Sequence, residues 1–111
     1  MEQNGIRDNR SRETPRPAAL YAGYDSNKRR RNQRKHKIDL AECETVFDAP
    51  MLTREDTRED YGEERLVSLG LLKDKAVVLV WTDRAEGPRL ISCREAESHE
   101  QATYFQAYPP Y

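Results

Sequence analysis

The stretch RLVSLGLLKDKAVVLVWTDRAEGPRLISC, residues 65–93, decides the fold of this chain. It contains three strand-like runs rich in large aliphatic and β-branched residues, at 65–72, 75–83 and 88–93. The connections between these runs are short enough for antiparallel hairpins. The middle run is apolar at both alternating sets of positions, which is typical of a central strand. We therefore predict a meander of three or four antiparallel strands.

Two helices are expected before this meander. Asp25 is well placed to cap a helix from Ser26 to about His36, which has no aliphatic residue and would rely on helix propensity and on arginine stems. Asp39 with Glu42 three residues later predicts a capping box at the start of a second helix. Its apolar face would hold Leu40, Cys43, Val46 and Phe47, and Pro50 would end it. Leu20, Tyr21 and Tyr24 suggest a short strand before the first helix.

A last helix is expected from Ala96 to about Tyr108, with His99, Ala102 and Phe105 on one side. The order of elements predicts an α+β domain, in which a small antiparallel sheet of three to four main strands is packed by two N-terminal helices and one C-terminal helix. Residues 1–18 are polar and contain two prolines, which predicts a disordered N-terminal tail. The single domain would cover residues 19–108, followed by a C-terminal tail at 109–111.

Charge is unevenly distributed along the 111 residues, although the formal net charge is only −1. Residues 28–37, KRRRNQRKHK, contain seven basic and no acidic residues, whereas residues 54–65 contain three basic and six acidic residues. A local basic patch attracts a phosphate backbone even when the total charge does not. A nuclear import address is the alternative interpretation of KRRRNQRKHK, but such short basic patterns are frequent by chance.

Several classes of protein do not fit the sequence. It has neither a run of 18 apolar residues nor a secretory signal, so we expect a cytoplasmic protein without a membrane partner. Cys43 and Cys93 lie fifty residues apart without a CxxC motif, which predicts reduced, partly buried thiols. No glycine-rich phosphate loop or GxSxG elbow occurs. No metal site and no cofactor are predicted.

Cations and hydrogen-bonding groups gather instead at the ends of the expected elements. Asn32, Lys35 and His36 share one face of the first helix. Arg65, Thr82, Arg89 and Arg94 lie at or near the ends of the expected strands.

These residues fall within five motifs in a fixed order. They are Asn32-x-x-Lys35-His36, ETVFDAP at 44–50, YGEER at 61–65, VVLVWT at 77–82 and RLISCREA at 89–96. In this order and spacing, residues 24–104 resemble the BrnT family of bacterial toxins, the toxic halves of type II toxin-antitoxin pairs with a RelE-like fold.

The resemblance implies a metal-independent ribonuclease that inhibits growth and translation. Its partners would be an RNA substrate and a cognate BrnA-like antitoxin, which also binds operator DNA. Attack of a 2′-oxygen on the adjacent phosphorus requires a proton acceptor, a proton donor and stabilisation of extra negative charge. The catalytic candidates are Arg65 and Arg94 for the phosphorane charge, and His36 or Glu64 for proton transfer. The candidates for RNA binding are Asn32, Lys35, Thr82, Arg89 and Tyr104.

Each candidate also has a structural alternative. Arg65 could pair with Asp60 or Glu63, and Arg94 with Glu95. His36 could be a cation favoured by a helix C-terminus, and Tyr104 could be a packing residue.

Five positions depart from the family pattern. Lys37 stands where the family usually has glycine, Cys93 where it has alanine, and Glu95, Ser98 and His99 where basic residues are common. These departures and the sequence pI of about 6.1 favour a second hypothesis, a catalytically weakened module that binds antitoxin and modulates operator binding.

Overall fold

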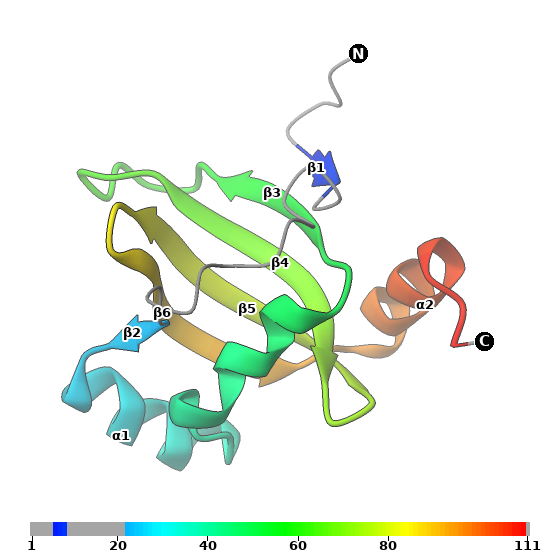
Figure 1. Ribbon diagram of the computed structural model, residues 1–111, viewed down its shortest axis with the longest axis horizontal. Coiled ribbons are helices and arrows are strands. Elements are labelled where there is room, and N and C mark those ends of the chain that lie inside the picture. Colours follow the sequence, from blue (N-terminus) through cyan, green and yellow to red (C-terminus); the bar gives the residue numbers. More distant parts are fainter. Residues whose placement is uncertain (1–5, 9–21, 111) are drawn as a thin grey trace.

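A six-stranded mixed sheet forms the centre of the protein, whose computed structural model describes residues 6–8 and 22–110 (Figure 1). In spatial order the strands are β1 (Ile6–Asp8), β3 (Leu52–Asp56), β4 (Arg65–Leu72), β5 (Lys75–Arg84), β6 (Gly87–Glu95) and β2 (Gly23–Tyr24). The meander β3–β6 is antiparallel throughout, which confirms the predicted runs. The prediction of a purely antiparallel sheet is wrong at one edge, because β2 runs parallel to β6. This pairing joins residues far apart in sequence, and short-range patterns do not report it.

The N-terminal segment also contributes to the sheet. Residues 6–8, within the expected disordered tail, pair with β3 as an antiparallel strand. The remainder of that tail lies outside the described residues, as do Leu20 and Tyr21 of the expected short strand. Among the described residues, no helix is long and apolar enough to cross a membrane.

Helix α1 (Ser26–His36) has the predicted bounds. The Asp25 carboxylate accepts a hydrogen bond from Asn27 N at 2.6 Å, which confirms the expected cap. At the other end Lys37 adopts the left-handed conformation, with φ 61°, and its backbone N–H donates to Gln33 O at 3.0 Å. Lysine thus takes the backbone shape that glycine more often supplies at the end of a helix.

The second helical segment, η2 (Leu40–Asp48), is a 3₁₀ helix rather than the expected α-helix. Leu40, Cys43 and Val46 are fully buried, and their spacing of three matches the three residues per turn of a 3₁₀ helix. Asp39 caps η2 by accepting from Ala41 N at 3.0 Å. The predicted capping box is not made, because the Glu42 carboxylate instead binds Lys73 Nζ at 2.8 Å.

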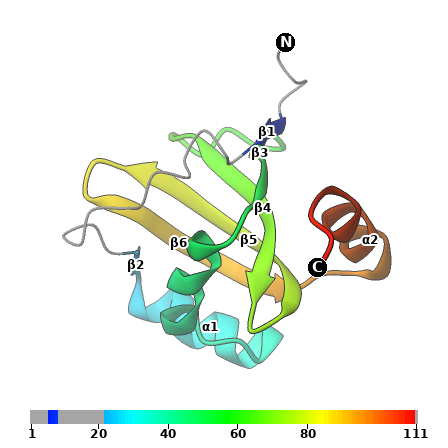
Figure 2. The same cartoon turned by 45° about the vertical axis from the view of Figure 1, so that its right-hand side comes forward.

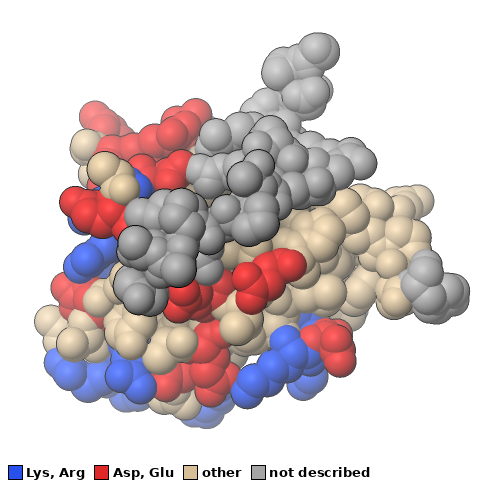
Figure 3. Space-filling model, in the orientation of Figure 1, with Lys and Arg blue, Asp and Glu red and all other residues tan. Residues whose placement is uncertain are grey.

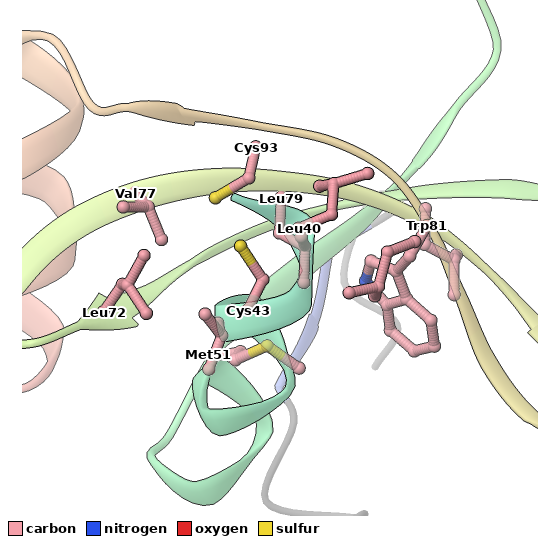
Figure 4. Packing of buried hydrophobic residues seen from close by; sticks show 11 residues of the cluster. Leu40, Cys43, Met51, Leu72, Val77, Leu79, Trp81 and Cys93 are labelled. Carbon is pink, nitrogen blue, oxygen red and sulfur yellow. The ribbon is translucent and has the colours of Figure 1, made fainter. Parts of the chain in front are cut away.

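The helical segment η2 and the C-terminal helix cover opposite faces of the sheet, as comparison of Figures 1 and 2 shows. Val77, Leu79 and Trp81 of β5 belong to the larger core under η2, whereas Ala76 and Val78 of the same strand pack towards the C-terminal helix α2 (Ser98–Ala107). Alternate residues of a strand point to opposite faces, so β5 is covered on both sides. The larger core is drawn in Figure 4.

The buried residue of α2 is Tyr104, at 1% exposure. Phe105 is half-buried against Ala76, Val78 and Ala96, whereas His99 and Ala102 are exposed. The predicted apolar side of this helix is therefore wrong for His99 and Ala102. The helix also starts two residues later than expected.

Candidate functional site

Charged side chains are unevenly distributed over the surface, with acidic groups also present between the basic ones. Lysine and arginine gather along the lower edge of Figure 3, where α1 lies, and acidic side chains gather at the upper left. We define the basic end as the C-terminus of α1, the β4–β5 turn and the end of β6, with Lys35, Lys37, Lys73, Lys75 and Arg94. The acidic loop is the β3–β4 connection, residues 57–64. A polyanion such as RNA is attracted to the first and repelled by the second.

Asn32 anchors α1 to the sheet. Its Nδ2 donates to Ile38 O at 2.8 Å and to Cys93 O at 2.9 Å, and its Oδ1 accepts from Cys93 N at 2.9 Å. The side-chain amide therefore binds the outer edge of β6 as a neighbouring strand would. Asn32 is 3% exposed, and its amide is already paired with the backbone, so the structure gives Asn32 a structural position and does not test the predicted RNA contact. Its functional effect is to hold the end of α1 in place.

His36, Lys35 and Arg94 meet at the basic end. His36 is half-buried and Lys35 is exposed at the end of α1, and Arg94 lies on β6. Burial lowers the pKa of His36 below its ordinary value, and the positive charges of Lys35 and Arg94 lower it further. The imidazole is therefore mainly neutral near pH 7 and able to accept a proton.

Arg94 is bound on one side by Glu100 of α2. Its Nη1 and Nη2 donate to Glu100 Oε1 and Oε2, both at 2.9 Å, and Nη1 also donates to Glu95 O at 3.4 Å. Glu100 Oε1 further accepts from Glu97 N at 2.8 Å, within the capping box that begins α2. The Arg94 hydrogen bonds lower the pKa of Glu100 to about 2. The ion-pair partner of Arg94 is thus Glu100 rather than Glu95. In the sequence, the three-residue spacing of Glu97 and Glu100 is typical of a capping box, but it does not indicate a contact with Arg94.

The other strand candidates lie elsewhere. Thr82 pairs with Arg89 across β5 and β6, and Arg65 starts β4 beside the acidic loop, directly after the exposed Glu64. Arg89 lies five residues before Arg94 on the same strand, a separation of roughly 16 Å at the usual rise per residue. The structure therefore splits the candidates into two groups at opposite ends of the sheet.

The acidic loop closes over Arg65. The Asp56 carboxylate accepts from Arg58 Nε at 2.9 Å and from Tyr61 OH at 3.2 Å, and these contacts, Arg58 foremost, lower the pKa of Asp56 to about 2. The Arg65 guanidinium stacks on the Tyr61 ring, 4.1 Å from its centroid. Within the described part of the chain, Arg65 Nε and Thr82 Oγ1 are buried without a hydrogen-bond partner. An RNA phosphate would reach Arg65 Nε only if the stacked Tyr61 ring moved.

The alternative pairing of Arg65 with Asp60 or Glu63 is not made. Asp60 accepts from Gly62 N at 3.0 Å, and Glu63 pairs with Arg84 at 3.1 Å.

Tyr104 belongs to the core. Its hydroxyl donates to Pro50 O at 2.8 Å, and burial raises the pKa of the phenol. The ring is covered in this conformation, so it presents no face to a base, and the predicted RNA contact of Tyr104 stays a prediction. Packing, the alternative given above for this residue, describes what the structure shows.

Among the described residues, no group of three or more His, Cys, Asp or Glu side chains is arranged to hold a metal ion. The buried Cys43 and Cys93 are both free thiols.

Comparison with known proteins identifies the chain. The family described as "Ribonuclease toxin, BrnT, of type II toxin-antitoxin system" matches residues 24–100. This range covers α1, η2, the meander β3–β6 and the start of α2. No curated protein matches the chain. Because the match extends over most of the sequence and holds both groups of candidate residues, the chain belongs to the BrnT family of ribonuclease toxins of type II toxin-antitoxin systems.

Proposed function

We propose that this protein cleaves RNA without a metal ion and that the reaction takes place at its basic end. The observation that carries the proposal is the half-buried His36, with its lowered pKa, beside the cations Lys35 and Arg94. This arrangement combines a proton acceptor for neutral pH with positive charge for a phosphate.

The reaction begins when neutral His36 accepts the proton of a 2′-hydroxyl. The 2′-oxygen then forms a bond to the adjacent phosphorus, and the bond from phosphorus to the 5′-oxygen breaks. The leaving 5′-oxygen takes a proton from water, which gives a 2′,3′-cyclic phosphate and a 5′-hydroxyl, and the hydroxide that remains takes the proton held by His36, which returns the imidazole to its neutral form. All atoms and charges balance without a metal ion.

Arg94 stabilises the negative charge that develops on the phosphorane. A guanidinium has five N–H donors, and the contacts of Arg94 with Glu100 and Glu95 occupy three of them. The remaining donors are available to phosphate oxygens. Lys35, exposed on the last turn of α1, binds a flanking phosphate as a point charge.

We place Glu64, Arg65, Thr82 and Arg89 outside the reaction centre. Arg65 Nε and Thr82 Oγ1 are buried, and the neighbouring acidic loop repels RNA. Their substitution should reduce cleavage less than substitution of His36 or Arg94.

In the cell, this activity would inhibit growth and translation until a cognate BrnA-like antitoxin covers the toxin. Operator DNA would be bound through the antitoxin in the complex. RNA and ribosomes are cytoplasmic, so we propose the cytoplasm as the site of action. A RelE-like fold is part of the same proposal, supported by the meander with helices on both faces.

The direct test is incubation of purified protein with single-stranded RNA in EDTA. Cleavage to a 2′,3′-cyclic phosphate is expected, with losses of about 10²-fold or more in His36→Ala and Arg94→Ala. Arg65→Ala and the exposed Arg30→Ala serve as comparisons within the same assay. The proposal fails if cleavage requires Mg²⁺ or if His36→Ala cleaves like the wild type.

A second candidate, a weakened toxin that acts mainly by binding its antitoxin, is favoured by the bidentate contact between Arg94 and Glu100. In that case the protein would bind the antitoxin with little turnover of RNA. Cleavage assays with RNA in excess over protein distinguish the two candidates. Only the first candidate predicts that each protein molecule cleaves many RNA molecules.

A further inference from the structure

A groove of about 610 Å³ lies beside His36, between the end of α1, the start of η2, the β4–β5 turn and the end of β6. This volume falls within the range of small-molecule sites, about 300–1,000 Å³. Its lining includes apolar side chains and charged groups, among them Ile38, Leu72, Lys75, Val77 and Glu95.

The apolar part of the lining suits a flat, uncharged group. Ile38 is partly buried and packs against the core drawn in Figure 4, which includes Leu72 and Val77 at 7% and 2% exposure. The apolar surface open to a ligand therefore comes mainly from Ile38. Lys37, Lys73 and Lys75 stand around the same groove. An aromatic ring can lie on the apolar surface while a phosphate attached to it meets a lysine.

Some polar groups of the groove are already occupied. Asp39 binds Arg29 Nε at 2.7 Å, and Glu42 binds Lys73 Nζ at 2.8 Å. Within the described residues, the side chains of Gln33, Lys75 and Glu95 make no hydrogen bond or ion pair. These three groups are therefore available to a ligand.

We propose that this groove binds one nucleobase next to the cleaved phosphate and that Glu95 selects guanine there. The inference rests on the proposed function, because His36 at the edge of the groove would mark the position of that phosphate. Glu95 is exposed and lines the groove, so it gives the groove a hydrogen-bond acceptor.

The choice of guanine follows from the chemistry of a carboxylate. An ionised carboxylate only accepts hydrogen bonds, and its two oxygens can bind two adjacent donors. Guanine presents N1–H and N2–H side by side on its Watson–Crick edge, whereas cytosine and adenine offer one amino group and uracil a single imino donor between carbonyl oxygens. A phosphate would be repelled by Glu95, so the base rather than the backbone should approach it.

Lys75 would have a different role. Its ammonium lies at the β4–β5 turn and would bind the backbone of the same nucleotide without regard to base identity. Glu95 should therefore govern selectivity, and Lys75 should govern affinity for all sequences.

The experiment measures binding of 2′-O-methyl pentanucleotides, which lack the attacking hydroxyl, by fluorescence anisotropy. One oligonucleotide has a single guanine among uracils and the other has uracil only. We expect the wild type to prefer guanine by about tenfold, as for a good bidentate base contact. Glu95→Gln should lose this preference. Lys75→Gln should weaken the binding of both oligonucleotides equally and reduce the slope of log K against log salt concentration by about 0.7.

Glu86→Gln is the matched control, since Glu86 is exposed in the β5–β6 turn at the other end of the sheet and the charge change is the same. Equal affinity of the wild type for both oligonucleotides would overturn the base assignment. A guanine preference that survives in Glu95→Gln would overturn the role of Glu95.

A cleavage assay of the same sequences, with 2′-hydroxyls, separates this inference from the proposed function. Cleavage without base preference removes only the groove assignment. Selective binding without cleavage leaves the groove assignment standing and removes the catalytic proposal.

Discussion

Arg94 of β6 and Glu100 of α2 are joined by two parallel hydrogen bonds of 2.9 Å. Glu100 also caps its own helix, so one carboxylate fixes both the start of α2 and the direction of the guanidinium. The cation best placed to meet RNA beside His36 is thus partly neutralised. The strength of this toxin should therefore depend on Glu100 as well as on Arg94.

Glu100→Gln is expected to tighten RNA binding. Glutamine can still accept from Glu97 N and keep the cap, but it no longer neutralises Arg94. The gain should be at most about fivefold, because partly exposed ion pairs are worth about 1 kcal/mol or less. Anisotropy with a 2′-O-methyl oligonucleotide measures it, with Glu86→Gln as the control for net charge. Weaker binding would show that Glu100 aims Arg94 rather than competing with RNA.

Cleavage should depend on pH through His36. Because burial, Lys35 and Arg94 lower its pKa below the ordinary 6.5, the rate should rise with pH and level off before neutrality. Lys35→Gln removes one positive charge and should shift this rise to higher pH. NMR titration of the His36 ring measures the same pKa, and His99→Gln assigns the two histidine signals. An unchanged titration in Lys35→Gln would contradict the proposed electrostatic coupling.

The same pKa shift has a consequence for stability. The pKa of His36 is lower in the folded protein than in the unfolded chain. The contribution of His36 to the free energy of unfolding is therefore present above pH 6.5 and is lost as the pH falls towards the lowered pKa of the folded state. Unfolding in urea at pH 5 and 7.5, compared between the wild type and His36→Gln, measures this difference.

Asn32→Ala should destabilise the fold by about 2–4 kcal/mol, because the N–H and C=O of Cys93 would both lose their partner. Urea unfolding measures the loss. Asn27→Ala, on the exposed side of the same helix, should change the free energy of unfolding by less than about 0.5 kcal/mol. Equal effects of the two substitutions would contradict the anchoring role of Asn32.

Tyr104→Phe separates packing from RNA binding. The variant loses only the hydrogen bond to Pro50 O, at a cost of about 0.5–1.5 kcal/mol, and should cleave RNA at the wild-type rate. A large loss of cleavage with unchanged stability would restore Tyr104 to the substrate site.

Gly70→Ala should destabilise the packing of η2 on the sheet. A Cβ at this position would lie 2.6 Å from Val46 Cγ1 and 3.3 Å from Met51 Cγ, which predicts a cost of about 1–3 kcal/mol. Gly23→Ala is the control, because its Cβ would lie 3.7 Å from the nearest atom, Arg89 Nη1, which is an ordinary contact. Val46→Ala combined with Gly70→Ala should recover part of the loss, and additive effects in this double-mutant cycle would contradict the clash.

Several elements could be predicted from the sequence because their signals are local. Strand β4 and helix α1 have the expected bounds, and Asp25 caps α1 as expected. The type of η2 was missed, because Leu40, Cys43 and Val46 fit one face of an α-helix nearly as well as the three-residue repeat of a 3₁₀ helix.

The candidate site was harder to predict, because residue types do not report where a side chain points. Lys35, His36 and Arg94 come together, but Arg65, Thr82 and Arg89 lie at the other end of the sheet. Asn32 and Tyr104 carry polar groups typical of RNA contacts, yet both are buried and hydrogen-bonded inside the protein.

The sequence by itself determined the α+β class, the central meander, the cap of α1 and the family, because these depend on side-chain periodicity and on motifs of a few residues. Only the tertiary structure decided that β2 lies parallel to β6, that Asn32 binds Cys93 across 61 residues, and that Glu100 holds Arg94. The physical reason is that hydrogen bonds and ion pairs between distant segments are selected by packing, which brings a few of many possible donors and acceptors within bonding distance.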